Sequence, residues 1–452
     1  MTTRRHFLGA AAAAGLGMPL LAEQAVEASA PAKMVSTNDK IQIALIGCGG
    51  MGQGDAETST GTKLTKLVAA CDCYDGRLVH MKEQYGQDIF TTKHYEEILS
   101  RPDIDAVIIG TPDHWHQKIS IDAMNAKKDV YCEKPMVQHI DDGAAVVEAQ
   151  KSTGRILQIG SQRVSSVIYQ KAQEIYRSGQ IGQLMMVEAW WDRNSAVGAW
   201  EYTVPNDADT TTCDWVRFQG RAPEVAWDPK RFFRWRCYRD YGTGVAGDLF
   251  VHLFSGLHFI TGATGPTRVF ATGGLRFWND GRDVPDVLLG LFDYPKTAAH
   301  PGFNLTLRVN FVSGAQESSG FRFVGSEGIM MVDSGVHLSK HPPQYDPGLS
   351  IDTFSDSMQA KITADHARQY PKKPVTAASL GANIDTVFRA PRGYSDHHDH
   401  HLNFAKSVRS RTPVVEDAVF GFRAAGPALL SNMSYFEGHP VEWDPIAMKL
   451  IA

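Results

Sequence analysis

This sequence has few cysteines, a small net charge and few long apolar runs. Only six of the 452 residues are cysteines, and the formal net charge is −5. Cys48, Cys71, Cys73 and Cys132 fall in or beside expected buried strands and the other two lie far downstream. This pattern is not a disulfide framework, and we interpret the six as small buried hydrophobes. The net charge gives no electrostatic case for nucleic-acid binding.

The most apolar stretch lies at the N-terminus. Residues 9–22 are too few and too rich in Ala and Gly for a stable membrane span. They follow Thr3-Arg4-Arg5-His6-Phe7-Leu8, a twin-arginine pattern, so residues 1–30 are expected to be a signal peptide cleaved after Ala28. The alternatives are an uncleaved lipid-proximal anchor and a chance pair of arginines. We expect export by the twin-arginine route, to the periplasm or beyond, and a mature protein without a membrane span.

The rest of the chain has the composition of a globular protein, with 43% hydrophobic and 21% charged residues. After a polar linker at 31–40, an apolar run at 41–46 reads as a buried parallel strand. It ends in the motif GCGGMG, which fits G-x-G-x-x-G. Gly47 permits a tight turn, Gly49 lets a pyrophosphate approach the backbone, and Gly52 lets the next helix pack on the strand. Phosphates would meet the helix N-terminus at Gly50 and Met51.

An acidic residue follows the second apolar strand, residues 66–71. Asp72 stands 25 positions after Gly47, close to the spacing expected for an acid on the adenosine ribose. A carboxylate there accepts from the 2′-hydroxyl and repels a 2′-phosphate, which favours NAD over NADP. The alternative is a surface acid that closes a strand.

Strands and helices alternate up to about residue 160, with further strands at 105–110, 129–132 and 156–160. This alternation predicts an α/β fold with a doubly wound parallel sheet over residues 41–162. Ligands of such sheets bind at the carboxyl ends of the strands. The expected cofactor-binding residues there, beyond the glycine turn and Asp72, are Thr111, Pro112, His114, His116, Glu133, Lys134 and Gln162.

The pattern changes in residues 163–452, the expected substrate-binding and oligomerisation domain. Alternation at 184–190, 303–311 and 320–332 indicates half-buried antiparallel strands. Residues 333–392 are rich in Pro, Ser and His and read as loop, and 401–437 reads as helices.

Glu133-Lys134-Pro135 follows directly on a strand. Pro135 fixes the turn, and this projects Lys134 over the mouth of the nucleotide cleft. A lysine there could exchange a proton with a substrate hydroxyl. The alternative is a structural lysine paired to Glu133.

Residues 247–260 form an almost wholly apolar stretch, expected to be a buried helix. Asp248, His252 and Ser255 stand at i, i+4 and i+7 and share one face. An Asp one turn from a His can orient the imidazole and raise its basicity. His258 points elsewhere and reads as a core histidine. The alternative for Asp248 and His252 is a structural hydrogen-bonded pair.

In this order and spacing, these motifs closely resemble the Gfo/Idh/MocA oxidoreductases. The resemblance implies a Rossmann domain followed by an α/β domain with an open, mostly antiparallel sheet, which often serves in oligomerisation to dimers or tetramers. It also implies that Lys134, Asp248 and His252 are the catalytic set. His252 would exchange the proton of the reacting hydroxyl and Lys134 would polarise it. Ser255 departs from a second Asp found in many members, which leaves open how the far hydroxyls of a substrate are held.

Three further residues are predicted to bind substrate: Arg163, which follows a strand end, and Trp235 and Arg236. The last two lie in residues 227–241, a stretch crowded with Trp, Phe, Tyr and Arg. This stretch would suit a sugar-stacking wall, or equally an interdomain or subunit packing surface. The histidines of 396–401 could bind zinc, but no second ligand set is identifiable and no metal is expected.

Together these features predict an exported NAD-dependent oxidoreductase acting on a secondary hydroxyl of a sugar, glycoside or polyol. Because free nicotinamide nucleotide is not expected outside the cytoplasm, the cofactor would stay bound and be regenerated by a second substrate. The first alternative is a glycoside hydrolase that uses bound NAD for transient oxidation and elimination. The second is a catalytically silent scaffold, against which Lys134, Asp248 and His252 argue.

Overall fold

The structure is a computed structural model that describes residues 40–340, 348, 350–371 and 386–451. The expected signal peptide, nearly all of the linker and parts of the 333–392 region lie outside the described residues. In the part of the chain that is described, no helix is long and apolar enough to cross a membrane.

The first half forms a six-stranded parallel sheet in the order β3-β2-β1-β4-β5-β6. Its strands are short apolar runs buried on both faces, as expected when helices cover a parallel sheet from both sides. The fold class expected for this half is thereby confirmed. The strands are β1 (Ile41–Ile46), β2 (Thr65–Cys71), β3 (Phe90–Thr92), β4 (Ala106–Ile109), β5 (Asp129–Cys132) and β6 (Leu157–Ile159).

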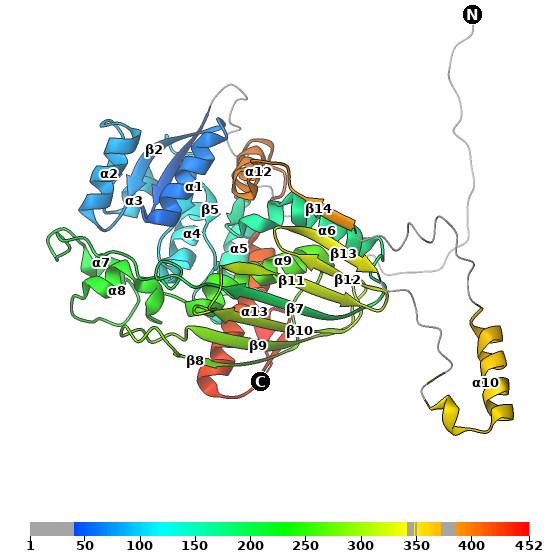
Figure 1. Ribbon diagram of the computed structural model, residues 1–452. Coiled ribbons are helices and arrows are strands. Elements are labelled where there is room, and N and C mark those ends of the chain that lie inside the picture. Colours follow the sequence, from blue (N-terminus) through cyan, green and yellow to red (C-terminus); the bar gives the residue numbers. More distant parts are fainter. Residues whose placement is uncertain (1–39, 341–347, 349, 372–385, 452) are drawn as a thin grey trace, which may run out of the picture. The chain divides into compact units, whose positions relative to one another are not determined.

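Helices connect these strands and place their own N-termini at the carboxyl edge of the sheet, so each strand end opens into a loop at the same edge (Figure 1). They are α1 (Gly50–Gly61), α2 (Asp75–Tyr85), α3 (Tyr95–Ser100), α4 (His116–Asn125) and α5 (Gly143–Thr153).

The second half is built on a ten-stranded sheet in the order β14-β13-β12-β11-β7-β10-β9-β8-β15-β16. Among these strands the β7–β10 pair is parallel and the other pairs are antiparallel, which confirms the expected open, mostly antiparallel sheet. The strands are β7 (Leu184–Asp192), β8 (Arg268–Gly274), β9 (Val287–Tyr294), β10 (Phe303–Asn310), β11 (Ser318–Gly325), β12 (Gly328–Val332), β13 (Gly335–Lys340), β14 (Thr386–Arg389), β15 (Val441–Asp444) and β16 (Lys449–Leu450).

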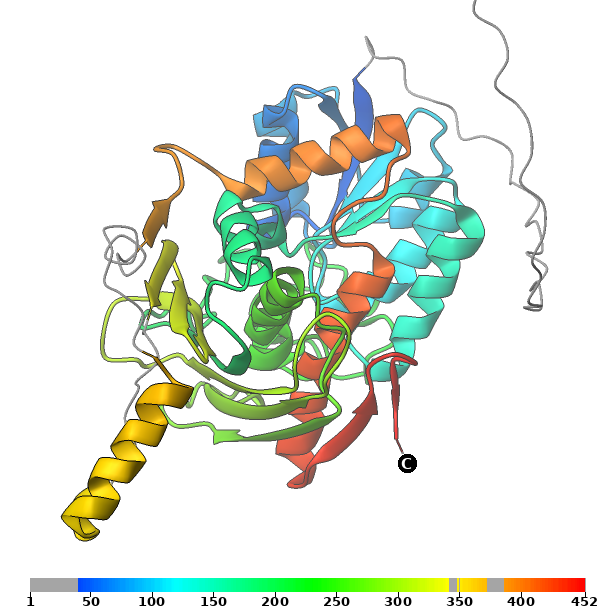
Figure 2. The same cartoon turned by 90° about the vertical axis from the view of Figure 1, so that its right-hand side faces the viewer.

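Helices cover one face of this sheet and leave the other open. Figure 1 shows the strands in front of α9 and α13, and Figure 2 shows α12 lying across the first half of the chain. Alternate residues of β9 and β10 are buried against these helices, as the period of two requires. The helices of this half are α6 (Val167–Arg177), α7 (Trp215–Gln219), α8 (Pro229–Phe233), α9 (Val251–Thr261), α10 (Asp356–Gln369), α12 (Asp396–Ser410) and α13 (Ala418–Glu437).

Two expectations for this half are corrected. The loop-like reading of 333–392 is wrong for β13, α10 and β14, because β13 follows β12 after a tight turn and extends the sheet in place of a loop. The helical tail starts at Asp396, where Ser395 accepts a bond from the His398 N–H, and not at His401. The cysteines agree with the expectation, since all six are free and five are buried.

Candidate active site

The glycine turn after β1 has the shape that a phosphate needs. Gly47 has a φ of +92°, and a Cβ there would lie 2.6 Å from the Gly110 backbone, so only glycine fits. A Cβ on Gly52 would lie 2.1 Å from the Gly47 oxygen, which explains how α1 packs so close to the turn. By contrast, the nearest protein atoms to a Cβ on Gly49 are 3.9 Å away, and one on Gly50 would meet nothing within 4 Å. The space over these two residues, at the N-terminus of α1, is therefore left for a ligand.

Asp72 lies at the carboxyl end of β2, 6% exposed, with its carboxylate fixed by backbone donors. Its Oδ2 accepts from the Cys48 N–H at 2.7 Å and its Oδ1 accepts from the Tyr74 N–H at 2.9 Å. Arg77 Nη1 lies 3.5 Å from Oδ2. A carboxylate has about four lone-pair sites, so these bonds leave it able to accept from a ribose hydroxyl.

A cavity of about 870 Å³ joins this turn to Asp72. Thr111 and Pro112 line it as expected, and the buried Thr111 Oγ1 has no hydrogen-bond partner among the described residues, which suits a polar ligand atom. Gly47, Gly49, Gly50 and Met51 line it too. Open space over the turn, a helix N-terminus and an orphan hydroxyl together fit a dinucleotide.

His114 and His116 do not line this cavity, and their expected role in cofactor binding is corrected. His114 lies within bonding distance of the Tyr241 and Phe218 carbonyls, at 3.3 and 2.8 Å. His116 lies within bonding distance of the Pro135 and Thr111 carbonyls, at 2.7 and 3.0 Å. Burial lowers the pKa of His114 to about 4 and also lowers that of His116. Both rings brace the backbone behind the cleft, and Trp115 between them faces the cavity instead.

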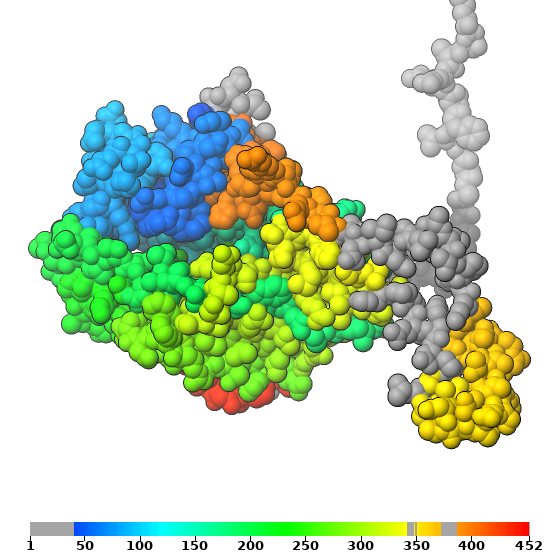
Figure 3. Space-filling view, viewed as in Figure 1, coloured from blue at the N-terminus to red at the C-terminus, as the bar shows by residue number. Residues whose placement is uncertain are grey.

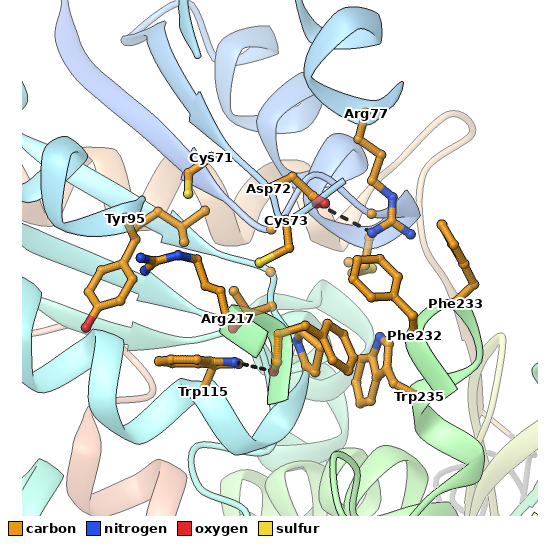
Figure 4. A pocket seen from close by; sticks show the side chains of 18 of the residues that line it. Cys71, Asp72, Cys73, Arg77, Tyr95, Trp115, Arg217, Phe232, Phe233 and Trp235 are labelled. Atoms are coloured by element: carbon orange, nitrogen blue, oxygen red, sulfur yellow. Dashed lines mark hydrogen bonds and ion pairs between the residues drawn. The ribbon is translucent and has the colours of Figure 1, made fainter. Parts of the chain in front are cut away.

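The opposite wall of the cavity comes from residues 200–245, which we call the cover segment. It contributes Tyr202, Arg217, Phe232, Phe233 and Trp235 to the lining. Figure 4 shows Phe232 and Trp235 across the cavity from Asp72, with Phe233 beside Arg77. In Figure 3 the atoms around α7 and α8 lie directly against those of the first half. The expected sugar wall around residue 235 is thus an aromatic wall of the nucleotide cavity.

Several contacts fasten the cover segment to the first half of the chain, and those near Asp72 include the following. Tyr74 Oη donates to Asp207 Oδ1 at 2.6 Å, and Arg217 lies 3.2 Å from Glu96. Lys93 Nζ donates to the Thr212 carbonyl at 3.2 Å, and the Asp214 N–H donates to the Cys73 carbonyl at 2.8 Å. These contacts surround the Asp72 end of the cavity, so the cover segment encloses the space beside Asp72.

Lys134 forms an ion pair with Asp248 across the two halves. Its Nζ lies 2.7 Å from Asp248 Oδ1 and donates to the Asp248 carbonyl at 3.1 Å. Arg236 Nε lies 3.3 Å from the same Oδ1. Burial alone would raise the pKa of Asp248, but the charges of Lys134, Arg236 and Arg193 outweigh it and hold that pKa well below its usual range. The structural alternative of a Lys134–Glu133 pair is wrong.

His252 lies in the same cavity but does not bond Asp248, so the expected orientation of the imidazole by this carboxylate is corrected. Residues Ala246–Phe250 form a π-helical turn, and the Asp248 carboxylate is taken up by Lys134 and Arg236. The His252 ring packs on Trp191 with centroids 5.2 Å apart, and its buried Nδ1 has no partner among the described residues. Burial and the charges of Lys134 and Arg163 lower the pKa of His252 well below its usual value. The imidazole is therefore neutral.

These three groups line a second cavity of about 1370 Å³, the inner cavity, which shares Gly50, Met51 and Arg236 with the nucleotide cavity. Glu133, Gln162 and Arg163 line it as well. Gln162 Nε2 donates to Glu133 Oε1 at 2.7 Å, and burial together with the nearby Asp55 raises the pKa of Glu133 well above its usual value. Trp235 lines only the nucleotide cavity, so its expected contact with substrate is not found.

Three polar residues of α9 and α12, Ser255, His258 and His400, have structural partners. Ser255 donates to the buried Glu416 at 3.1 Å and does not line the inner cavity. His258 Nε2 lies 2.9 Å from Tyr294 Oη in the core. His400 lies between Ser165 Oγ and the Ile159 carbonyl. The described residues hold no group of three or more side chains that could bind a metal ion.

Sequence reasoning missed several residues that line the inner cavity. Trp191 lies at the carboxyl end of β7 and Arg193 comes directly after it. An aromatic and a charged residue at the end of an alternating strand could have been predicted to line a site. Tyr202 and His397 carried no such signal, since only the tertiary fold brings them to the cavity.

Two family profiles match the chain. Residues 41–161 match the profile described as "Oxidoreductase family, NAD-binding Rossmann fold", and residues 212–331 match the "GFO/IDH/MocA C-terminal domain". Inositol 2-dehydrogenase of Salmonella paratyphi B is 31% identical over 170 residues, which are 36% of this chain and 49% of that protein. The match thus spans about half the length of the curated relatives.

Solved structures share the fold over most of the chain. The aldose–aldose oxidoreductase of Caulobacter crescentus, complexed with glycerol, has a TM-score of 0.63 at 16% identity and covers 89% of this chain and 100% of its own. The WlbA dehydrogenase of Bordetella pertussis, in complex with NADH and UDP-GlcNAcA, has a TM-score of 0.63 at 15% identity, over 90% and 99%. With the two profiles in chain order on the two halves described above, the chain belongs to the Gfo/Idh/MocA family, with an NAD-binding Rossmann domain followed by the family's C-terminal domain.

Proposed function

We propose that this protein is an NAD-dependent oxidoreductase that oxidises a secondary hydroxyl of a sugar, glycoside or polyol. The observation that carries the proposal is the Lys134–Asp248 pair beside a neutral His252, in a cavity continuous with a nucleotide-shaped cleft. Relatives named inositol 2-dehydrogenase and aldose–aldose oxidoreductase support the substrate class.

The chemistry divides between the cofactor and the chain. When bound, NAD supplies the acceptor for the hydride that leaves the carbinol carbon. Lys134 has three N–H donors and gives two to Asp248, so the third can donate to the substrate oxygen and hold it. We assign the hydroxyl proton to His252 as the carbonyl forms, because its imidazole lines the inner cavity beside Lys134 and is neutral.

Asp248 positions this pair and does not itself take a proton. Its carboxylate is held ionised by Lys134 and Arg236 and fixes Lys134 Nζ at the mouth of the cavity. Removal of the carboxylate would leave two buried cations uncompensated, which is strongly destabilising at such sites.

We propose further that the cofactor is retained through turnover and is regenerated by a second sugar or carbonyl substrate. The cover segment, fastened by Tyr74, Lys93 and Arg217, supports slow release of the nucleotide. The twin-arginine motif Thr3–Leu8 supports export to a compartment without free nucleotide. Both proposals agree, since a protein exported in the folded state would have to carry its cofactor with it.

The test starts from protein purified without added nucleotide. The protein is denatured and the released small molecules are identified by mass spectrometry; separate native samples receive sugars and aryl glycosides while absorbance is followed at the reduced-nicotinamide band. Stoichiometric NAD(H) and a lasting rise in absorbance with one sugar are the expected results. Release of aglycone without a lasting rise would favour the NAD-dependent hydrolase. No response to any sugar or glycoside, with or without added NAD, would contradict the proposed function.

We also propose a homo-oligomer formed through the open face of the second sheet. Phe270 and Leu291 lie opposite each other on β8 and β9 and are 37% and 56% exposed, with Leu289 at 45% beside them. Such apolar patches mark interaction surfaces. Light scattering on Leu291→Glu should give a lower mass than on the wild type, whereas Val79→Glu on α2 should not. A monomeric wild type would contradict the proposal.

A further inference from the structure

A third cavity, the outer cavity, of about 1220 Å³, adjoins the inner one and has no role in the chemistry described above. The two cavities share Arg163, Trp191 and His397. A substrate whose reacting carbon lies at Lys134 and His252 therefore has a polar space to extend into. Resting on the proposed function, we propose that the outer cavity is a second sugar subsite, which binds a neutral glycosyl unit attached to the sugar that is oxidised.

The floor of the outer cavity is a continuation of the sheet. Trp191 on β7 and Ser319 on β11 are directly opposite each other in an antiparallel pair, so their side chains point to the same face. The next residues along this face, Ala189 and Phe321, are buried under the helices. At Trp191 and Ser319 the same face emerges from the helices, and this leaves an aromatic ring and a hydroxyl group open to a ligand.

Arg163 stands at the junction of the two cavities. Its guanidinium lies 4.4 Å from the centroid of the Trp191 ring, and its Nη1 donates to Ser319 Oγ at 3.0 Å. No carboxylate of the described residues forms an ion pair with it within 4.0 Å. Arginine has five N–H donors, so it can donate to hydroxyl or ring oxygens on both sides of the junction. This is a donor set for a glycosidic linkage and its neighbouring hydroxyls.

Three carboxylates from separate elements form the rim. Glu317 precedes β11, Asp333 lies in the turn between β12 and β13, and Asp396 begins α12. Each carboxylate accepts hydrogen bonds on one oxygen: Glu317 from Ser195 Oγ, Asp333 from the Gly335 N–H and Ser334 Oγ, and Asp396 from the His397 N–H. The second oxygen of each can accept from a ligand hydroxyl.

The charges of the lining select the class of ligand. Three carboxylates disfavour a uronate, phosphate or sulfate in the outer cavity, since like charges repel at close range. A cationic sugar would meet Arg163 at the junction. A neutral ring with many hydroxyls can both donate to the carboxylates and accept from Arg163 and the serines. The lining therefore matches a neutral hexopyranosyl unit, and the preferred substrate is a glycoside or disaccharide, in preference to a free monosaccharide.

The experiment compares each disaccharide with its parent sugar: glucose with cellobiose and maltose, and galactose with lactose. Reduction of the bound nicotinamide gives kcat/KM for each, and calorimetric titration of the purified protein gives its affinity. The variant Ser334→Trp fills the outer cavity from its rim, and Ser152→Trp on the exposed face of α5 is the matched control. The measured quantity is the ratio of disaccharide to monosaccharide, in kcat/KM and in affinity.

The proposal predicts a ratio of about ten or more for at least one disaccharide, equivalent to about 1.4 kcal/mol. Ser334→Trp should bring this ratio to about one, and Ser152→Trp should leave it as in the wild type. Ratios near one in the wild type, or a high ratio that survives Ser334→Trp, would overturn the subsite while the proposed function stands. If no sugar reduces the nicotinamide, the proposed function fails separately. In that case the calorimetric ratio of disaccharide to monosaccharide affinity tests the subsite. If neither sugar binds, or if both bind equally well, the subsite proposal is wrong.

Discussion

Lys134 Nζ lies 2.7 Å from Asp248 Oδ1, and this ion pair joins the Rossmann domain to the π-helical turn that precedes α9 in the second domain. The two side chains are only 9% and 12% exposed. The pair therefore links the NAD-binding Rossmann domain to the second domain, at the place where the proposed reaction brings nucleotide and substrate together.

Replacement of Lys134 tests this role. Lys134→Met should lower kcat by about 10²- to 10³-fold, the range for loss of a preorganised hydrogen-bond donor to the reacting oxygen. The nucleotide released on denaturation should stay stoichiometric, because Lys134 lies in the inner cavity and not in the nucleotide cavity. Lys151→Met, on an exposed site of α5, is the control. A kcat within twofold of the control would exclude Lys134 from the chemistry.

Asp72 is predicted to set the preference for NAD. Asp72→Ala removes the acceptor for the ribose hydroxyl, and loss of a hydrogen bond to a charged group costs about 1.5–3 kcal/mol, or about 10- to 100-fold in affinity for NAD. The same change releases Arg77, 3.5 Å from the carboxylate, to face a 2′-phosphate. Affinity for NADP should therefore rise. Titration of nucleotide-stripped protein measures both, with Asp88→Ala on the surface as control; unchanged selectivity would contradict the assignment.

The cover segment is predicted to slow the loss of nucleotide. Tyr74→Phe removes the donor to Asp207 but keeps the ring, so the nucleotide should dissociate about fivefold faster, corresponding to ~1 kcal/mol for one hydrogen bond. The rate is measured by dilution into an excess of a nucleotide scavenger. Tyr176→Phe on α6 should release nucleotide at the wild-type rate. Equal rates in both variants would mean that the cover segment does not limit release.

We predict that His258 makes the free energy of unfolding depend on pH. Burial, aided by the charges of Arg423 and His300, lowers its pKa to about 3. Below about pH 6.5 the unfolded chain takes up a proton here that the native protein does not, so this contribution is complete above pH 6.5 and is lost as the pH falls toward 3. The stability difference between wild type and His258→Gln in urea should shrink by ~1.4 kcal/mol per pH unit in that window. A stability difference for His258→Gln that stays constant over this pH range would refute the prediction.

Much of the site was predictable because parallel strands deliver their carboxyl ends to one edge. Gly47, Asp72 and Lys134 each follow directly on an apolar run, so the alternation of strands and helices alone places them around one cleft. The sharing of one cavity by Asp248 and His252 was likewise predictable from helical spacing.

What could not be predicted depends on partners distant in sequence. Helical spacing favoured a bond between Asp248 and His252, but Lys134, 114 residues away, takes the carboxylate instead. His114 and His116 follow a strand end, yet their rings turn to backbone carbonyls that only the folded chain brings near. Tyr74 and Asp207, whose hydrogen bond fastens the cover segment, are 133 residues apart in the chain. No local sequence pattern indicates such a contact.

The central claim is that His252 takes the hydroxyl proton, from an oxygen held by Lys134, while the carbinol hydrogen leaves as hydride to bound NAD. The most direct test is single-turnover reduction of the protein's own nicotinamide by its best sugar, with and without deuterium at the reacting carbon. The account predicts slower reduction with the deuterated sugar, and loss of the reaction in Lys134→Met protein that still holds its nucleotide. Equal rates with both sugars under single-turnover conditions, together with an active Lys134→Met variant, would contradict it.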